Sequence, residues 1–191
     1  MQDKILKNGK LFVISGPSGA GKSTLIEEVL KSLGNFKASV SVTTRPKRKN
    51  EIEGKKYIFI SDSEFDDYIK KGQFLEHAVY CGYKYGTPKD FVKRELGRGN
   101  NVLLEIEVQG AMQVKNSMPE AYMIFIMPGT IEELKKRLSK RNTESLIEIE
   151  RRLQAAKKEL DFQQYYDCII INNDYNEALL NLKYILNENT K

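Results

Sequence analysis

The sequence has few of the residues on which metal clusters and disulfide frameworks depend. Its 191 residues include one histidine and two cysteines, Cys81 and Cys168, with no Cys-x-x-Cys motif. This excludes a zinc cluster and makes a reducing, cytoplasmic setting the expectation. A chain of this length can bury a core without disulfide bonds.

Long apolar stretches are also missing. The longest, residues 123–127, is far shorter than the roughly 20 residues needed to span a bilayer. Charged residues such as Lys4 and Lys7 lie near the amino end, so we expect neither a membrane span nor a secretory leader. The composition, 40% hydrophobic and 30% charged, excludes a disordered or fibrous chain.

The charge balance leaves several partner classes open. Lysine and arginine number 31 against 26 for aspartate and glutamate, giving a net charge of +5. Such a balance suits nucleic acid, anionic lipid or phosphorylated small molecules equally, so the positions of the arginines must decide.

Apolar runs separated by helix-length stretches indicate a doubly wound α/β core. No repeat or linker interrupts the chain, which favours insertions into a single fold over two serial domains. Parallel strands joined by crossover helices produce this alternation. The candidate buried strands are residues 11–15, 102–106, 122–126 and 168–171.

Two stretches interrupt this alternation of strands and helices. Between about residues 39 and 86 the chain turns polar and tyrosine-rich, which predicts a small α+β insertion. Its expected elements are a strand at 56–60, a capped helix at 63–71 and two short strands within 73–85.

Residues 130–158 predict a charged helical pair that forms a mobile lid. The capping boxes Thr130-x-x-Glu133 and Ser145-x-x-Glu148 begin its helices, and the chain breaks near Asn142. We therefore expect a single domain over 1–191 that contains a core, an insertion and a lid. The core covers about 1–38, 88–129 and 159–191, the insertion about 39–87, and the lid about 130–158.

A phosphate-binding loop joins the first strand to the first helix. Gly16-Pro-Ser-Gly-Ala-Gly-Lys22-Ser23 fits the pattern G-x-x-x-x-G-K-[ST] in the context that this motif demands. Its backbone N–H groups and the helix dipole form an anion cradle, Lys22 reaches the β and γ phosphates, and the Ser23 hydroxyl ligates Mg²⁺. The expected ATP-binding residues here are Gly16, Pro17, Ser18, Gly19, Ala20, Gly21, Lys22, Ser23 and Thr24.

An arginine-containing loop indicates the phosphoryl acceptor. Pro46 biases Arg45 toward an extended conformation, so Arg45 and Arg48 project from a loop toward one anion. Guanidinium groups bind phosphate in a bidentate manner. A solvated basic loop and a nucleic-acid patch are the alternatives.

Glu76 followed by Tyr85, Gly86 and Thr87 completes a pattern that resembles guanylate kinases almost from end to end. The resemblance implies a P-loop nucleoside monophosphate kinase fold and Mg-assisted, in-line transfer from ATP to GMP, and to dGMP, in purine nucleotide metabolism. It implies ATP and GMP as partners, with no nucleic acid or membrane, and leaves the oligomeric state open.

The resemblance also assigns residues to GMP. Two of these residues could instead have a purely structural role. Glu76 could be a solvent-facing strand residue, and Thr87, which precedes Pro88, could be the N-cap of the helix that follows. A carboxylate at Glu76 would accept bonds from guanine N1–H and N2, a donor pair that adenine lacks. The implied phosphate contacts are Ser41, Arg45, Arg48, Tyr57 and Tyr85, and the implied guanine contacts are Glu76, Thr87 and Glu107.

Three of these acceptor-side positions depart from the family pattern. Guanylate kinases often have serine at the position of Thr87 and aspartate at those of Glu105 and Glu107. We expect Glu105 and Glu107 to share one face of a strand at its carboxyl end, where ligands bind in open α/β sheets. A purely structural role for Glu105 is an equal alternative.

The lid arginines and one asparagine complete the implied ATP side. Arg137 and Arg141 lie four residues apart on one helix face, and Arg152 follows on the next helix. Together with Lys22 and Arg45, Arg137 and Arg152 would offset charge during transfer; a salt-bridged solvated face is the alternative. Asn172 matches the family position beside adenine, where an ordinary turn is the alternative.

Two other functions remain open at the level of sequence. One is a guanylate-kinase-like scaffolding module that binds phosphopeptides, although such modules have degraded phosphate loops and here Lys22 and Ser23 are intact. The other is a kinase of the same architecture that acts on a different phosphorylated acceptor.

Overall fold

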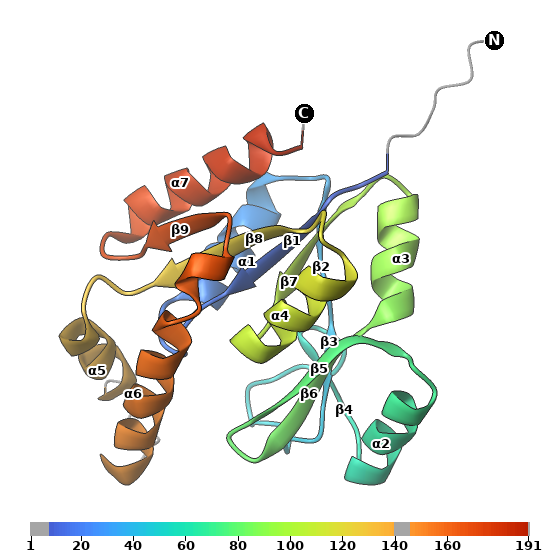
Figure 1. The fold of residues 1–191 in the computed structure, drawn as a ribbon, viewed down its shortest axis with the longest axis horizontal. Helices are drawn as coiled ribbons and strands as arrows, with labels where there is room; N and C mark the ends of the chain where they lie inside the picture. The colour runs from blue at the N-terminus through green and yellow to red at the C-terminus, as the bar shows by residue number, and fades with distance from the viewer. Residues whose placement is uncertain (1–7, 140–145, 191) are drawn as a thin grey trace. The chain divides into compact units, whose positions relative to one another are not determined.

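The computed structural model describes residues 8–139 and 146–190 of the chain (Figure 1). The chain divides into two compact units. The first contains Met1–Phe12 and Asn35–Ala121, and the second contains Val13–Gly34 and Tyr122–Lys191. Strand β1 (Leu11–Ser15) crosses the boundary between them, so each unit is described in turn below.

The main sheet has the strand order β2-β7-β1-β8-β9. In the first unit β2 pairs with β7 in parallel, and in the second unit β8 pairs with β9 in parallel. All five residues of β1 are buried, as expected for a parallel strand covered on both faces. The four strands predicted from apolar runs are therefore present. The remaining strands are β2 (Phe36–Ala38), β7 (Asn101–Glu105), β8 (Tyr122–Met127) and β9 (Cys168–Ile171).

Amphipathic helices flank these strands within each unit. In the second unit α1 (Lys22–Ser32) packs with α7 (Tyr175–Glu188). Helix α7 begins at the N-cap Asp174, whose side chain accepts a hydrogen bond from the Glu177 N–H at 2.9 Å. In the first unit α3 (Lys89–Gly97) packs on β7, and α4 (Val108–Ser117) packs on β5 (Phe74–Tyr80), a strand of the insertion.

The predicted α+β insertion forms a second sheet with the order β4-β3-β6-β5. Cys81 and Gly82, between β5 and β6, have φ values of 50° and 82°, as a tight two-residue hairpin turn requires. The helix α2 begins one residue before the predicted start because Ser61, not Ser63, forms its capping box with Glu64. The elements are β3 (Ser41–Thr43), β4 (Tyr57–Phe59), α2 (Asp62–Lys70), β5 (Phe74–Tyr80) and β6 (Tyr83–Pro88).

The predicted helical pair is present in the second unit as α5 (Ile131–Ser139) and α6 (Leu146–Leu160). The Thr130 hydroxyl accepts a hydrogen bond from the Glu133 N–H at 3.1 Å, which confirms the cap at the start of α5. The break near Asn142 and the second capping box, at Ser145, lie outside the described residues. The two helices share an apolar cluster made of Leu134, Leu138, Ile149, Leu153 and Ala156.

Each helix within residues 8–139 and 146–190 is too short or too polar to cross a membrane. The 3-10 helix η1 (Gln163–Tyr165) connects α6 to β9.

Candidate active site

The phosphate loop connects β1 to α1 in the second unit, and two of its glycines are fixed by their surroundings. Gly16 has φ 135°, and a Cβ atom there would lie 1.9 Å from the Ile126 carbonyl oxygen. Gly21 has φ 90°, and its Cβ would lie 2.3 Å from the Asn172 Nδ2 atom. Only glycine fits both positions, so the loop keeps the tight backbone turn that an anion cradle needs.

Lys22 is held over this loop by the loop's own backbone. Its side chain is buried, with 8% of the residue exposed, and Nζ donates to the Gly16 oxygen at 2.5 Å and the Pro17 oxygen at 3.1 Å. The ammonium is thus placed beside the cradle but satisfied by carbonyl groups. Ser23 follows on the first turn of α1, where backbone N–H groups have no partner inside the helix.

Asn172 joins the phosphate loop to the end of β9. Its side-chain Nδ2 donates to the backbone oxygen of Ala20 at 2.7 Å, and its backbone carbonyl oxygen accepts from the Arg137 Nη2 at 2.8 Å. Asn172 is therefore more than an ordinary turn residue, because its buried side chain anchors the loop. A cavity of about 200 Å³ lies here, lined by Gly21, Thr24, Arg137, Asn172, Asn173 and Tyr175.

The lid arginines differ in what they contact. Arg137 also donates from Nε to the Glu133 carboxylate at 3.0 Å, so the predicted salt bridge within the helix exists alongside its contact with Asn172. Arg152 of α6 donates to the Ser18 hydroxyl of the phosphate loop. Arg141 lies outside the described residues.

In the first unit Arg45 is buried within a cage of carboxylate and aromatic groups. Its guanidinium makes two hydrogen bonds with the Glu51 carboxylate, at 2.7 and 3.0 Å, and lies 5.4 Å from the ring centroid of Tyr57 and 5.5 Å from that of Phe59. The Arg45 guanidinium lowers the pKa of Glu51. The alternative of a solvated basic loop is therefore wrong for Arg45, of which 8% is exposed.

Three other predicted phosphate contacts lie on β3, β4 and β6, the paired strands next to the Arg45 loop. Ser41 pairs with Tyr57 across β3 and β4, while Tyr85 pairs with Thr43 across β6 and β3. The Tyr57 and Tyr85 rings contact each other at a centroid distance of 6.0 Å. Burial raises the pKa of both phenols, so their hydroxyl groups stay protonated and can donate.

Arg48 is exposed, unlike Arg45. Its backbone N–H donates to the Glu51 carboxylate at 2.8 Å, and this bond holds the backbone of the loop at Arg48 in place. Glu51 thus organises both arginines of the loop, although sequence reasoning did not single it out. The only available signal was an acid six residues after Arg45 in a strongly basic loop.

Glu76 is buried on β5 and pairs with Thr87 of β6. Only 4% of Glu76 is exposed, so the solvent-facing alternative is wrong. The Thr87 hydroxyl donates to the Glu76 Oε1 atom at 2.5 Å, and the two residues are register partners. Burial is the main cause that raises the pKa of Glu76 to about 7, and the nearby Glu107 raises it further.

The N-cap alternative for Thr87 is wrong. Helix α3 begins at Lys89 with Pro88 at its N-cap, and Thr87 is the preceding strand residue with its side chain fully buried against Glu76. The strand pairing with Glu76 takes precedence over capping because it satisfies a buried carboxylate.

Glu105 is the last residue of β7 and Glu107 lies beyond the strand, which corrects the prediction of a shared strand face. Strand β7 ends at Glu105, and Glu107 is the N-cap residue of α4, with an extended backbone at φ −73° and ψ 158°. Both carboxylates nevertheless lie near Tyr57, where they add to the larger effect of burial in raising the pKa of its phenol. Glu105 forms an ion pair with Lys56 at 2.9 Å, which gives it a structural partner. Glu107 lies close enough to Glu76 to affect its pKa, as a shared base site would require.

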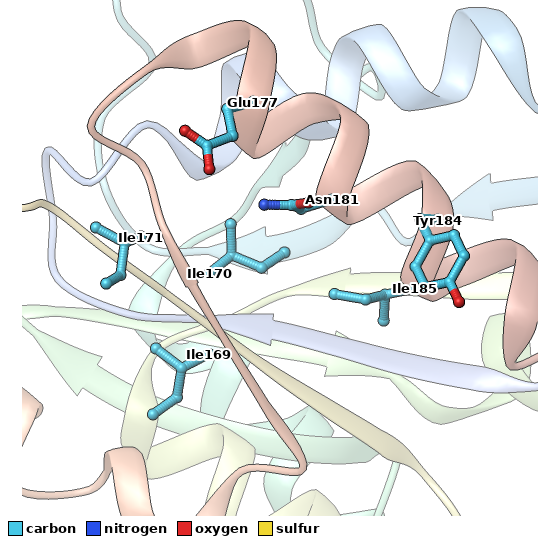
Figure 2. A pocket seen from close by; sticks show the side chains of 7 residues that line it. All are labelled: Ile169, Ile170, Ile171, Glu177, Asn181, Tyr184 and Ile185. Carbon is cyan, nitrogen blue, oxygen red and sulfur yellow. The ribbon is translucent and has the colours of Figure 1, made fainter.

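A cavity of about 290 Å³ lies between β9 and α7 in the second unit (Figure 2). None of the seven described residues that line it is basic, so it does not suit a nucleotide phosphate. Figure 2 shows an isoleucine-rich wall opposite Glu177 and Asn181. The groups that suit a phosphate are found at the phosphate loop and in the Arg45 cage, and not among the residues that line this cavity.

Comparison with known proteins identifies the family of this chain. The guanylate kinase family model matches residues 8–189, a range that includes the phosphate loop and the insertion with Arg45 and Glu76. The chain belongs to the guanylate kinase family. Membership confirms the resemblance and the fold class predicted from the sequence.

Individual guanylate kinases agree with the family match over nearly the whole chain. That of Desulfitobacterium hafniense is 46% identical over 179 residues, covering 94% of this chain and 90% of the relative. That of Caldanaerobacter subterraneus is 44% identical over 182 residues, covering 95% and 88%. The crystal structure of guanylate kinase from Anaplasma phagocytophilum aligns with a TM-score of 0.81 at 34% identity, covering 96% of this chain and 87% of that one.

Proposed function

We propose that this guanylate kinase family member transfers the γ-phosphoryl group of ATP to the phosphate of GMP, giving ADP and GDP. The observation that carries the proposal is the presence, in one chain of this family, of an intact phosphate loop and a buried carboxylate suited to guanine. The intact Lys22 and Ser23 favour an enzyme over a phosphopeptide-binding module. A cytoplasmic location completes the proposal.

ATP is proposed to bind in the second unit. The N–H groups of the glycine turn and of the first turn of α1 would receive its phosphates, and Lys22 would exchange its carbonyl partners for phosphate oxygens. Asn172 and Arg137 border the cavity of about 200 Å³ beside the loop, which we assign to the adenosine part. The proposed ATP contacts are Gly16, Pro17, Ser18, Gly19, Ala20, Gly21, Lys22, Ser23, Thr24, Arg141 and Asn172.

GMP is proposed to bind in the first unit, with its phosphate at Arg45. The two tyrosine hydroxyls and the Arg45 cage provide donors to a phosphate, and exposed Arg48 can add a second guanidinium. Guanine would place N1–H and N2 against the Glu76 carboxylate. The proposed contacts are Ser41, Arg45, Arg48, Tyr57 and Tyr85 to the phosphate, and Glu76, Thr87 and Glu107 to the base.

The residues present also fit a magnesium ion that arrives with ATP. Ser23 follows the loop lysine, where its hydroxyl can supply one oxygen ligand. In the described part of the chain no group of three or more histidine, cysteine, aspartate or glutamate side chains could hold a metal alone. We infer that most ligands come from phosphate oxygens and water, which Mg²⁺ prefers. Bound there, the ion would neutralise charge on the β and γ phosphates.

No general base is needed for this transfer. The second pKa of a phosphate monoester is about 6, so the GMP phosphate is already largely ionised at neutral pH. The proposed work of the protein is to orient two polyanions in line and to offset their repulsion with Lys22, Arg45, Arg137 and Arg152. Closure of the α5–α6 lid would exclude water from the transferred group.

ADP release from Mg·ATP tests the proposal when GMP, dGMP, AMP, dTMP or no acceptor is added. We expect fast turnover with GMP and dGMP and only background turnover with the other three. Equal rates with AMP and GMP would refute the base-reading role of Glu76. Turnover that does not depend on any acceptor would refute the kinase assignment itself.

A further inference from the structure

Gly110 occupies a position in the third place of helix α4 where a side chain cannot fit. Glycine inside a helix is unfavourable relative to alanine, so its presence there needs a reason. A Cβ atom at Gly110 would lie 2.0 Å from Oε2 of Glu76 and 2.8 Å from its Cδ. The carboxylate of Glu76 therefore fills the volume that a methyl group at residue 110 would take.

Helix α4 cannot move away to make room for that methyl group. Gln113 lies three residues after Gly110, on the same side of the helix. Its Nε2 donates to the His77 carbonyl oxygen at 2.7 Å, and its Oε1 accepts from the His77 N–H at 3.1 Å. These two bonds clamp the helix to β5 at the residue next to Glu76. Buried Ala111 and Val114 hold the helix from within the core of the unit.

The opposite side of the carboxylate is fixed by Thr87, whose hydroxyl donates to Oε1 at 2.5 Å. Glu76 is thus held between a hydroxyl donor on one oxygen and the bare backbone of a glycine at the other. We propose that Gly110 is a positioning residue for purine specificity: its missing side chain sets where the Glu76 carboxylate meets the base. This rests on the proposed role of Glu76 toward GMP.

The expected ligand is a purine monophosphate with a hydrogen on N1 and an amine on C2. Ordinary contact begins near 3.4 Å, and the present distance to Oε2 is 2.0 Å, so a methyl group at residue 110 would displace that oxygen by about 1.4 Å. A misplacement of this size at a reacting or recognising group costs up to about 10²-fold. We therefore expect Gly110→Ala to lower kcat/KM for GMP by about 10- to 100-fold, mainly through KM.

The experiment compares four variants with the wild type in the ADP-release assay. These are Gly110→Ala, Glu76→Ala, the double variant and Gly97→Ala. Gly97 ends helix α3 with open space around its Cβ position, so Gly97→Ala is the matched control and should leave turnover unchanged. GMP, inosine monophosphate and AMP serve as acceptors, and circular dichroism follows folding.

A positioning role makes four results necessary. Gly110→Ala should raise KM for GMP and lower the preference for GMP over inosine monophosphate and AMP, while KM for ATP stays within about twofold. In the Glu76→Ala background the Gly110→Ala change should have no further effect on GMP, because its target is gone.

Several outcomes would overturn it. They are an unchanged GMP preference in Gly110→Ala, an equal rise in KM for GMP and ATP, and additive losses in the double variant. A Gly110→Ala variant that melts near the wild-type temperature and keeps the wild-type preference for GMP would also contradict the proposal. If Glu76→Ala alone keeps the wild-type preference, the proposed role of Glu76 fails, and that result is distinct from a failure at Gly110.

Discussion

The buried carboxylate of Glu76 predicts that stability falls as pH rises. Its pKa increases from the ordinary value of 4.5 to about 7 in the folded chain, chiefly because burial disfavours the charged form. A folded-state pKa above the unfolded one means that the native chain holds the proton more tightly. This contribution to stability is complete below pH 4.5 and is lost as pH rises through about 7.

The size of the effect follows from the two pKa values. An acid whose pKa rises from 4.5 to about 7 on folding loses about 3 kcal/mol across that interval, at 1.36 kcal/mol for each pH unit. Between pH 5 and pH 8 the expected loss is about 2 to 3 kcal/mol, because part of the interval lies below pH 5. Glu76→Gln removes the titration but keeps the shape and an oxygen that can accept from Thr87.

Urea unfolding of the wild type and Glu76→Gln at pH 5 and pH 8 measures this contribution. Other titrating groups are common to both proteins, so the difference between them isolates Glu76. We expect the wild type to lose about 2 to 3 kcal/mol relative to the variant on going from pH 5 to pH 8. Stability curves that run parallel over this range would refute the argument that burial controls this carboxyl group.

Two further predictions concern the phosphate-binding groups. Lys22→Ala should lower kcat by about 10² to 10³, as loss of a preorganised charge on the transferred group does, and a wild-type rate would overturn the phosphate-loop assignment. Glu51→Gln removes the bidentate partner of Arg45, so we expect KM for GMP to rise by about tenfold while KM for ATP is unchanged. The same variant should lose about 1 to 3 kcal/mol in urea unfolding, and unchanged stability and KM together would contradict the role of this ion pair.

The phosphate loop could be predicted from the sequence because its structure is local. A buried strand, glycines at fixed spacing and a helix are contiguous in the chain, so residues 16–24 carry both the signal and the site. The alternation of apolar runs likewise determined the parallel strands, since burial on both faces requires such runs. The cap at Thr130 is local for the same reason, as it needs only the N–H of a residue three positions later.

The environments of the acceptor-side residues were decided by tertiary structure. Whether Thr87 caps a helix or bonds to Glu76 depends on the register of β5 and β6, and the sequence around Thr87 allows both. That Glu51 holds Arg45, and that Gly110 leaves room for Glu76, depends on how a loop folds back and where α4 packs. The sequence alone determined the residue types, but the burial of these side chains and their hydrogen-bond partners arise from contacts between distant segments. Those contacts set the charge state and position of each group.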